Sequence, residues 1–171
     1  MAKAGQIPYS DAMSAIALPK VWQGSLGIRW QFRAGGSGSP ESHSARTTLS
    51  INGVTQEGFF VDVFHKESFL PHVPDKVAFA LVAFGARVLC LDENGVSNHV
   101  NMVGKGLPHY GLRPDHPHLH IPVPESCSGY AEPVDRADLA ILWRYFLERA
   151  NISGGPEFRL PPKDEQQMGL L

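Results

Sequence analysis

The strongest structural signal in this chain is TTLSINGVTQEGFFVDVF, which runs from Thr47 to Phe64. Asn52 and Gly53 separate two segments rich in β-branched and aromatic residues, and an Asn-Gly pair readily adopts the positive φ angles of a tight turn. The pattern therefore predicts an antiparallel hairpin with strands over Thr47–Ile51 and Phe59–Phe64.

Further strands are predicted on both sides of this hairpin. After it, the apolar segments Val77–Val82 and Ala86–Leu91 are joined through Gly85, so they form either a second hairpin or one long bent strand. Before it, Val21–Phe32 contains alternating apolar and polar residues, which predicts the first strand. Between this first strand and the hairpin, the Gly/Ser/Pro-rich residues 34–43 are typical of a flexible loop.

Two helices are predicted. Ser10 and Asp11 can cap a short helix that ends at Ala17. A second, amphipathic helix is expected to begin near Asp135 and to end at Asn151. Its apolar residues recur three and four positions apart and would form one stripe against the sheet: Leu139, Leu142, Trp143, Phe146, Leu147 and Ala150.

Together these elements predict an α+β fold. We expect an antiparallel sheet of about five or six strands, packed against the C-terminal amphipathic helix and preceded by a short N-terminal helix. The single domain is expected to cover residues 9–152, between a loose tail over 1–8 and an irregular tail over 153–171. A hydrophobic content of 43% and a charged content of 19% suit such a domain.

Composition also narrows the functional classes. The formal net charge of -2 provides no global basic field, so any contact with RNA would have to be local. The chain has 2 cysteines, and Met1–Ser10 lacks the apolar core of a secretory signal, which leads us to expect a cytoplasmic protein. No apolar run reaches the roughly 20 residues of a membrane span, so no membrane partner is expected.

Histidines gather late in the chain. Residues 96–115 are polar without periodicity, and loops of this length in compact domains are commonly functional. HPHLHIPV, residues 116–123, follows directly. On an extended strand His116, His118 and His120 would share one face, and the alternate residues would enter the core. The three prolines of this region predict an edge strand or a short pairing.

These side chains suggest two kinds of chemistry. Imidazoles titrate near neutrality, so a pair can act as general base and general acid, and neutral imidazoles can also bind a metal. Asp92, at the end of an earlier strand, could orient an imidazole or complete a metal coordination sphere. The catalytic candidates, and equally the ligands of a divalent metal such as zinc, are His118, His120, His99 and Asp92. The alternative is a solvated edge strand with ordinary hydrogen bonds.

Two segments read together resemble a known pattern. Residues 91–95 (LDENG), with His99 and Asn101, precede PHLHI at residues 117–121. This resembles a family of small bacterial and phage-borne proteins, which is similar in pattern to the TumE-type toxins of toxin-antitoxin pairs. The resemblance implies a TumE-like fold, activity toward RNA and a cognate antitoxin. One extra residue, Asn98, and a longer loop over residues 102–116 depart from the pattern.

The run HPHLHIP also superficially resembles the motif of the histidine-triad nucleotide hydrolases. In that family an apolar residue stands where this chain has Pro117, and a helix precedes the motif where this chain has the loop of residues 96–115. We therefore interpret this second similarity as a coincidence.

Three hypotheses follow. The first is a toxin-like ribonuclease or phosphodiesterase that uses the histidines as general acid and base, with substrate contacts from Asn94, Asn101, Lys105, Arg113 and His116. The second is a metal-dependent hydrolase built on the same histidines and Asp92. The third is a protein-binding module of a mobile element, which pairs with a partner through an exposed strand. A second copy of the chain is a further candidate partner.

Overall fold

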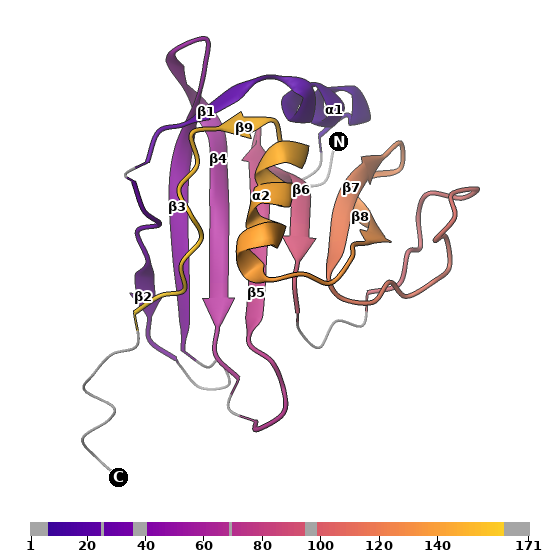
Figure 1. Ribbon diagram of the computed structural model, residues 1–171. Coiled ribbons are helices and arrows are strands. Elements are labelled where there is room, and N and C mark those ends of the chain that lie inside the picture. The colour runs from indigo at the N-terminus through magenta and orange to yellow at the C-terminus, as the bar shows by residue number, and fades with distance from the viewer. Residues whose placement is uncertain (1–6, 25, 36–40, 69, 95–98, 163–171) are drawn as a thin grey trace.

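The computed structural model describes residues 7–24, 26–35, 41–68, 70–94 and 99–162. Over these residues the chain forms one curled sheet of nine strands with two short helices, and 41% of them lie in strands against 14% in helices (Figure 1). The predicted sheet of five or six strands packed on one helix is therefore wrong. The additional strands are short or lack clear alternation, so the local pattern did not reveal them.

The described elements, in chain order, are α1 (Tyr9–Ala17), β1 (Lys20–Trp22), β2 (Gln31–Arg33), β3 (Ser42–Ile51), β4 (Val54–Lys66), β5 (Lys76–Ala83), β6 (Ala86–Asp92), β7 (His118–Val123), β8 (Ser126–Pro133), α2 (Leu139–Arg149) and β9 (Ile152–Ser153). Neighbouring strands pair in the order β8-β7-β6-β5-β4-β3-β1-β9, and β2 also pairs with β3. These pairs are antiparallel except for the parallel pair of β1 and β9.

The hairpin predicted around Asn52 and Gly53 is confirmed. β3 and β4 pair across these two residues, whose φ angles of 52° and 76° lie in the left-handed region that Asn and Gly tolerate best. β5 and β6 form a second hairpin through Phe84 and Gly85, with φ angles of 53° and 77°. The two apolar segments are thus a hairpin and not one bent strand.

The single strand predicted over Val21–Phe32 is wrong. Its two ends form β1 and β2, which pair with opposite ends of β3. Between them, a Cβ atom at Gly24 would lie only 2.4 Å from Nε1 of Trp22. The indole therefore occupies the space that a side chain at this position would need, and glycine permits that close approach.

The strand that carries the histidines, β7, is not at the edge of the sheet, so the edge position is wrong, while the other predicted alternative, a short pairing, fits the three residue pairs between β7 and β6. β7 pairs with β6 on one side and with β8 on the other, and β8 has no counterpart among the predicted strands. Pro122, which has no N–H to donate, lies where the pairing register between β7 and β8 shifts. Pro117 and Pro124 flank the strand, so the three prolines leave the regular ladder intact.

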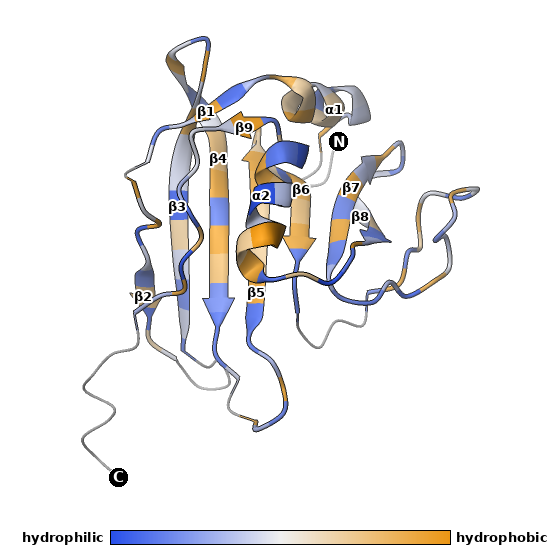
Figure 2. Ribbon diagram, viewed as in Figure 1, coloured by the Kyte–Doolittle hydropathy of each residue, from blue (hydrophilic) through white to orange (hydrophobic). Residues whose placement is uncertain are grey.

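α2 packs on one face of the sheet (Figure 1), where the central strands carry long apolar runs (Figure 2). Trp143 of α2 is fully buried, and its ring centroid lies 5.0 Å from that of Phe79 and 5.8 Å from that of Trp22. Aromatic contacts of this kind contribute a large share of a core's stabilisation. Most of the predicted apolar stripe is buried, namely Leu142, Trp143, Phe146, Leu147 and Ala150, and Leu139 packs partly buried against the same core.

The boundaries of α2 differ from those predicted at one end only. The helix begins at Leu139 after Asp138, not near Asp135, and the Asp138 side chain makes no capping hydrogen bond. Asn151, with a φ angle of 51°, ends the helix as predicted.

The chain after α2 continues across the same face of the sheet. β9 pairs with β1, and the indole Nε1 of Trp143 donates to the Pro156 carbonyl at 2.7 Å. Nε1 of Trp30 likewise donates to the Arg159 carbonyl at 3.0 Å. The predicted tails at the two ends of the chain lie outside the described residues over 1–6 and 163–171.

The predicted short helix is confirmed as α1, although no side chain caps its N-terminus. Its C-terminal end is bound by Lys20, which is 1% exposed. The Lys20 ammonium donates to the carbonyls of Ala15, Ile16 and Leu18 at 2.7, 3.0 and 2.5 Å. Burial lowers the pKa of Lys20 to about 8. Neither helix in the described part of the chain is long and apolar enough to cross a bilayer.

Candidate metal centre

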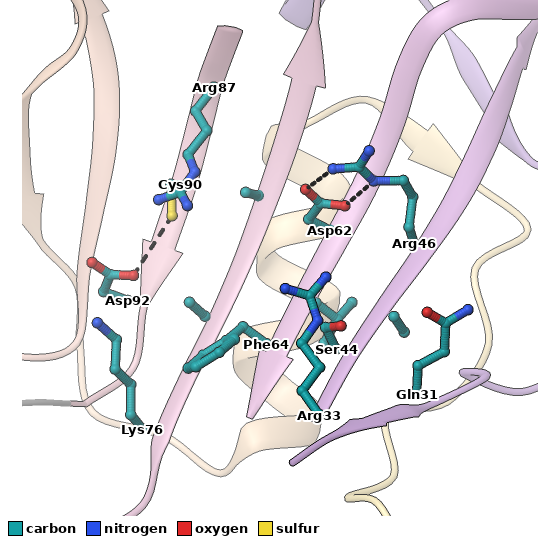
Figure 3. Close-up of a pocket in the computed structure, with 14 residues that line it drawn as sticks. Gln31, Arg33, Ser44, Arg46, Asp62, Phe64, Lys76, Arg87, Cys90 and Asp92 are labelled. Carbon is teal, nitrogen blue, oxygen red and sulfur yellow. Dashed lines mark hydrogen bonds and ion pairs between the residues drawn. The ribbon is translucent and has the colours of Figure 1, made fainter. Parts of the chain in front are cut away.

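The register between β6 and β7 places an acidic residue beside the histidines. Asp92 pairs directly with His118, and Cys90 pairs with His120. Because side chains alternate along a strand, these four point to one face of the sheet, while the leucine between each pair enters the core. The face that carries Cys90 and Asp92 is the one opposite α2 (Figure 3).

Asp92 and two imidazoles form a compact cluster. Oδ2 of Asp92 lies 3.5 Å from Nε2 of His120 and 3.7 Å from Nε2 of His118. The side chain of His118 is 0% exposed, whereas His120 and Asp92 retain exposures of 13% and 20%. A solvated edge strand with ordinary surface histidines is therefore not what the structure contains. Solvent reaches the cluster through His120 and Asp92.

The other ring nitrogen of each histidine faces a backbone carbonyl. Nδ1 of His118 lies 3.2 Å from the Asp115 oxygen, and Nδ1 of His120 lies 3.0 Å from the Ser128 oxygen. A carbonyl oxygen only accepts hydrogen bonds, so each Nδ1 carries a proton and donates it. In a neutral imidazole the remaining nitrogen, Nε2, then presents a lone pair, and the Nε2 atoms of both rings lie toward the Asp92 carboxylate.

A positive charge between Asp92 and His118 would stabilise this arrangement. Burial lowers the pKa of His118 to about 4, helped by its neighbours His120 and His116, so its ring is neutral near pH 7. Its Nε2 is buried and has no hydrogen-bond partner. Burial would raise the pKa of Asp92, but His120 and then Lys76 outweigh it and lower that pKa to about 2. A carboxylate thus faces a neutral nitrogen lone pair, which is repulsive unless a cation lies between them.

The spacing of the three groups matches that of a metal coordination sphere. Two atoms bound to one zinc ion at about 2.1 Å in tetrahedral geometry lie about 3.4 Å apart. The two nitrogen-to-oxygen distances of 3.5 and 3.7 Å are close to this value. The ligand atoms of Asp92, His118 and His120 all lie within 4.8 Å of one another. Two imidazoles and one carboxylate are a ligand set that zinc and related divalent ions accept.

His99 joins the cluster from the long loop. Its ring centroid lies 4.7 Å from that of His120 and 6.2 Å from that of His118. Its Nε2 lies 3.0 Å from Oδ1 of Asn101. The same Oδ1 accepts the Ala131 N–H at 2.8 Å, while the Asn101 amide donates elsewhere, so His99 is the donor of this bond.

Asn101, a predicted substrate contact, lies inside the protein. It is 0% exposed, and its Nδ2 donates to the carbonyls of Ala131 and His109 at 2.8 and 3.0 Å. The residue thus anchors the long loop to β8 and orients His99. The backbone groups that Asn101 binds are distant from it in sequence, so the sequence did not reveal this role.

The other predicted substrate contacts lie around the cluster or on its approaches. The His116 ring is half-buried and lies 4.4 Å from that of His118, centroid to centroid. Arg113 is exposed and lowers the pKa of His116, behind the larger effects of burial and Lys76. Lys105 is exposed in a turn of the loop, and Asn94 is half-buried two residues after Asp92.

A hollow with a volume of about 640 Å³ lies next to the cluster on the same face of the sheet (Figure 3). It contains Asp92 together with four cationic residues that the sequence did not single out, Arg33, Arg46, Lys76 and Arg87. They come from β2, β3, β5 and β6, so no contiguous motif contains them. These cations occupy strand positions at which polar residues alternate with apolar ones. That alternation was the signal for them in the sequence.

The buried thiol of Cys90 also faces this hollow. Its Sγ lies 3.6 Å from Oδ1 of Asp92. Burial, and then the Asp92 charge, raise the pKa of Cys90. The thiol is therefore protonated at neutral pH and is neither a nucleophile nor a soft metal ligand in this state.

Comparison of the chain with protein-family models, with curated proteins and with solved structures found no match.

Proposed function

We propose that this protein is a metal-dependent hydrolase whose divalent ion, such as zinc, is held by Asp92, His118 and His120. One observation carries the proposal: the Nε2 atoms of two imidazoles converge on one carboxylate at a spacing close to that of two ligands on one zinc ion, and the Nε2 of His118 is buried without a hydrogen-bond partner. The carbonyls that accept from the Nδ1 atoms fix both rings in the metal-binding tautomer, as the outer partners of histidine ligands do in metal sites.

The proposed centre has three protein ligands and is partly exposed to solvent. Three protein ligands are typical of catalytic zinc sites, where the bound ion lowers the pKa of a water molecule and polarises the substrate. The exposed edges of His120 and Asp92 define the side from which water and substrate would arrive. The ring centroid of His99 lies 4.7 Å from that of His120, so His99 would be a further imidazole able to exchange protons with a molecule bound at this centre.

A metal-free phosphodiesterase is the second candidate. The observation that favours it is the pair of His120 and Asp92, both partly exposed and 3.5 Å apart, which would let a protonated His120 act as general acid. The burial of His118 works against it, because the predicted division of labour between His118 and His120 requires both rings to reach the substrate.

Metal content separates the two candidates. The protein is to be purified without an affinity tag, reconstituted with Zn²⁺, dialysed and analysed for bound metal. We expect about one ion per chain for the wild type and for His72→Asn, which removes an exposed histidine whose positive φ angle Asn tolerates. Asp92→Asn and His120→Asn are expected to weaken binding by at least about 100-fold. A wild type that retains well under one ion per chain would overturn the metal centre and favour the second candidate.

A further inference from the structure

The hollow beside the metal centre has a floor of small residues and a rim of long ones. Ala78 and Ala80 of β5 line it with short side chains, and Ala80 is 5% exposed. Long side chains also line it, from Gln31 and Arg33 of β2, Lys76 of β5 and Arg87 of β6 (Figure 3). Because Asp92 also lines the hollow, a molecule bound in it would lie beside one ligand of the proposed metal centre.

The charge of this hollow is opposite to that of the whole chain. Its cations are Arg33, Arg46, Lys76 and Arg87. Asp62 neutralises Arg46 through two hydrogen bonds of 2.7 and 2.8 Å. Asp92 is the other acidic residue of the lining and belongs to the proposed metal centre.

The remaining cations, Arg33, Lys76 and Arg87, have no hydrogen bond or ion pair with any described side chain. A protein with a formal net charge of -2 thus gathers three cationic side chains without an ion pair of their own in one depression, where Lys76 also interacts electrostatically with Asp92. Such a concentration attracts anions locally even where the global field does not.

The positions of these cations relative to Asp92 suit successive phosphates. Asp92 pairs with Ala78, which is two residues from Lys76 on the same strand, and Figure 3 shows the Lys76 ammonium close to the Asp92 carboxylate. Arg87 extends along β6 toward Cys90, and Arg33 enters from β2 on the opposite side (Figure 3). A chain of phosphates could therefore cross the hollow with one of them at the metal centre.

An aromatic ring completes the surface. Phe64 of β4 lines the hollow between Arg33 and Lys76, and it is only half-buried (Figure 3). An apolar ring that faces solvent between cations is the arrangement on which proteins stack unpaired bases while they hold the phosphates. Gln31 and Ser44 add hydrogen-bonding groups at the side of β2 and β3.

We propose that this hollow binds single-stranded nucleic acid, with Arg33, Lys76 and Arg87 on its phosphates and Phe64 against a base. The inference rests on the proposed function, because it makes a phosphodiester next to Asp92 the bond that is hydrolysed.

Binding is measured without hydrolysis, so that the two proposals are tested separately. In EDTA, the fluorescence anisotropy of a labelled single-stranded RNA of about 12 nucleotides reports the affinity at several salt concentrations. We expect Arg33→Gln/Lys76→Gln/Arg87→Gln to bind at least about 10-fold more weakly than the wild type. Its salt dependence should be shallower by about 0.7 per lost phosphate contact. Phe64→Leu should weaken binding without changing that slope.

A matched control removes the same charge elsewhere. Arg136→Gln/Arg144→Gln/Arg159→Gln eliminates three exposed arginines outside the hollow. We expect it to keep wild-type affinity, and we expect both triple variants to bind Zn²⁺ as the wild type does.

Equal affinity of the wild type and the hollow variant, or an equal loss in the control, would overturn the nucleic-acid site even if zinc binds. Failure to bind zinc, with the affinity for RNA dependent on the hollow, would overturn only the metal centre.

Discussion

Asp92 and His118 face each other across the β6–β7 pair, with their closest oxygen and nitrogen 3.7 Å apart and no proton available on that nitrogen in the neutral ring. A polar contact of this kind is unfavourable in the buried state unless a cation completes it. The cost is acceptable at a site whose ligand supplies the cation, because ligand binding then stabilises the fold.

Zinc should stabilise the folded state through Asp92. At a free concentration about 100-fold above Kd, the stabilisation would be about 2.7 kcal/mol. Thermal unfolding monitored by circular dichroism should show a higher Tm for the wild type with Zn²⁺ than in EDTA. The Tm of Asp92→Asn should be the same in both. An equal increase in the two proteins would place the stabilising ion elsewhere.

The stability of the metal-free protein should decrease in mild acid because of His118. Its pKa is about 4 in the folded state against 6.5 for an unperturbed histidine, so the unfolded chain binds more protons between these values. The contribution is complete above pH 6.5 and is lost as the pH falls to about 4, by up to roughly 3 kcal/mol. Urea unfolding in EDTA at a series of pH values measures it.

His118→Asn is the matched variant for this titration, since its amide can still donate to the Asp115 carbonyl but does not titrate. Its stability should vary less between pH 6.5 and 4 than that of the wild type. Identical pH profiles would show that another group is responsible.

Asn101 should be important for stability although it lies in a loop. Its side chain makes four hydrogen bonds, to His99, His109 and both backbone groups of Ala131, and it is 0% exposed. We expect Asn101→Ala to reduce the free energy of unfolding by roughly 2–4 kcal/mol, because buried partners lose their bonds. Limited proteolysis should then cleave within residues 102–116 faster than in the wild type. A loss below about 1 kcal/mol would contradict this anchoring role.

Lys20 should stabilise the end of α1. Its buried ammonium donates to three carbonyls there, and charged hydrogen bonds contribute more than neutral ones. Lys20→Met keeps the length and the apolar stem but leaves the carbonyls unpaired, which should cost roughly 1–3 kcal/mol. Hydrogen exchange of the α1 amides should accelerate more than that of the central strands. Uniform acceleration would mean that the bond supports the whole fold.

Local features were readable from the sequence because they depend on neighbouring residues. Asn52-Gly53 specifies its turn through its own φ preferences, and the three-and-four spacing of Trp143 and its neighbours specifies a buried helix face. The alternation in HPHLHIPV likewise placed His118 and His120 on one face. Each of these signals lies within a short segment of the chain. In such a segment the backbone geometry alone determines how the side chains are placed relative to one another.

The number of strands in the sheet could not be predicted from such local patterns. β2 and β9 are only three and two residues long, and each exists because a neighbouring strand offers unpaired backbone groups. β7 is an interior strand because β8 pairs with its other side. The short proline-containing sequence of β7 does not indicate that pairing.

Thus the chain's own pattern determined that imidazoles would line up on an extended segment and that an acidic turn would end an earlier strand. Tertiary structure alone set the register that puts Asp92 opposite His118, the carbonyls that fix both rings, and the hollow that gathers Arg33, Lys76 and Arg87. The physical reason is that strand pairing joins residues far apart in sequence, and a shift of one residue would turn each of these side chains to the other face.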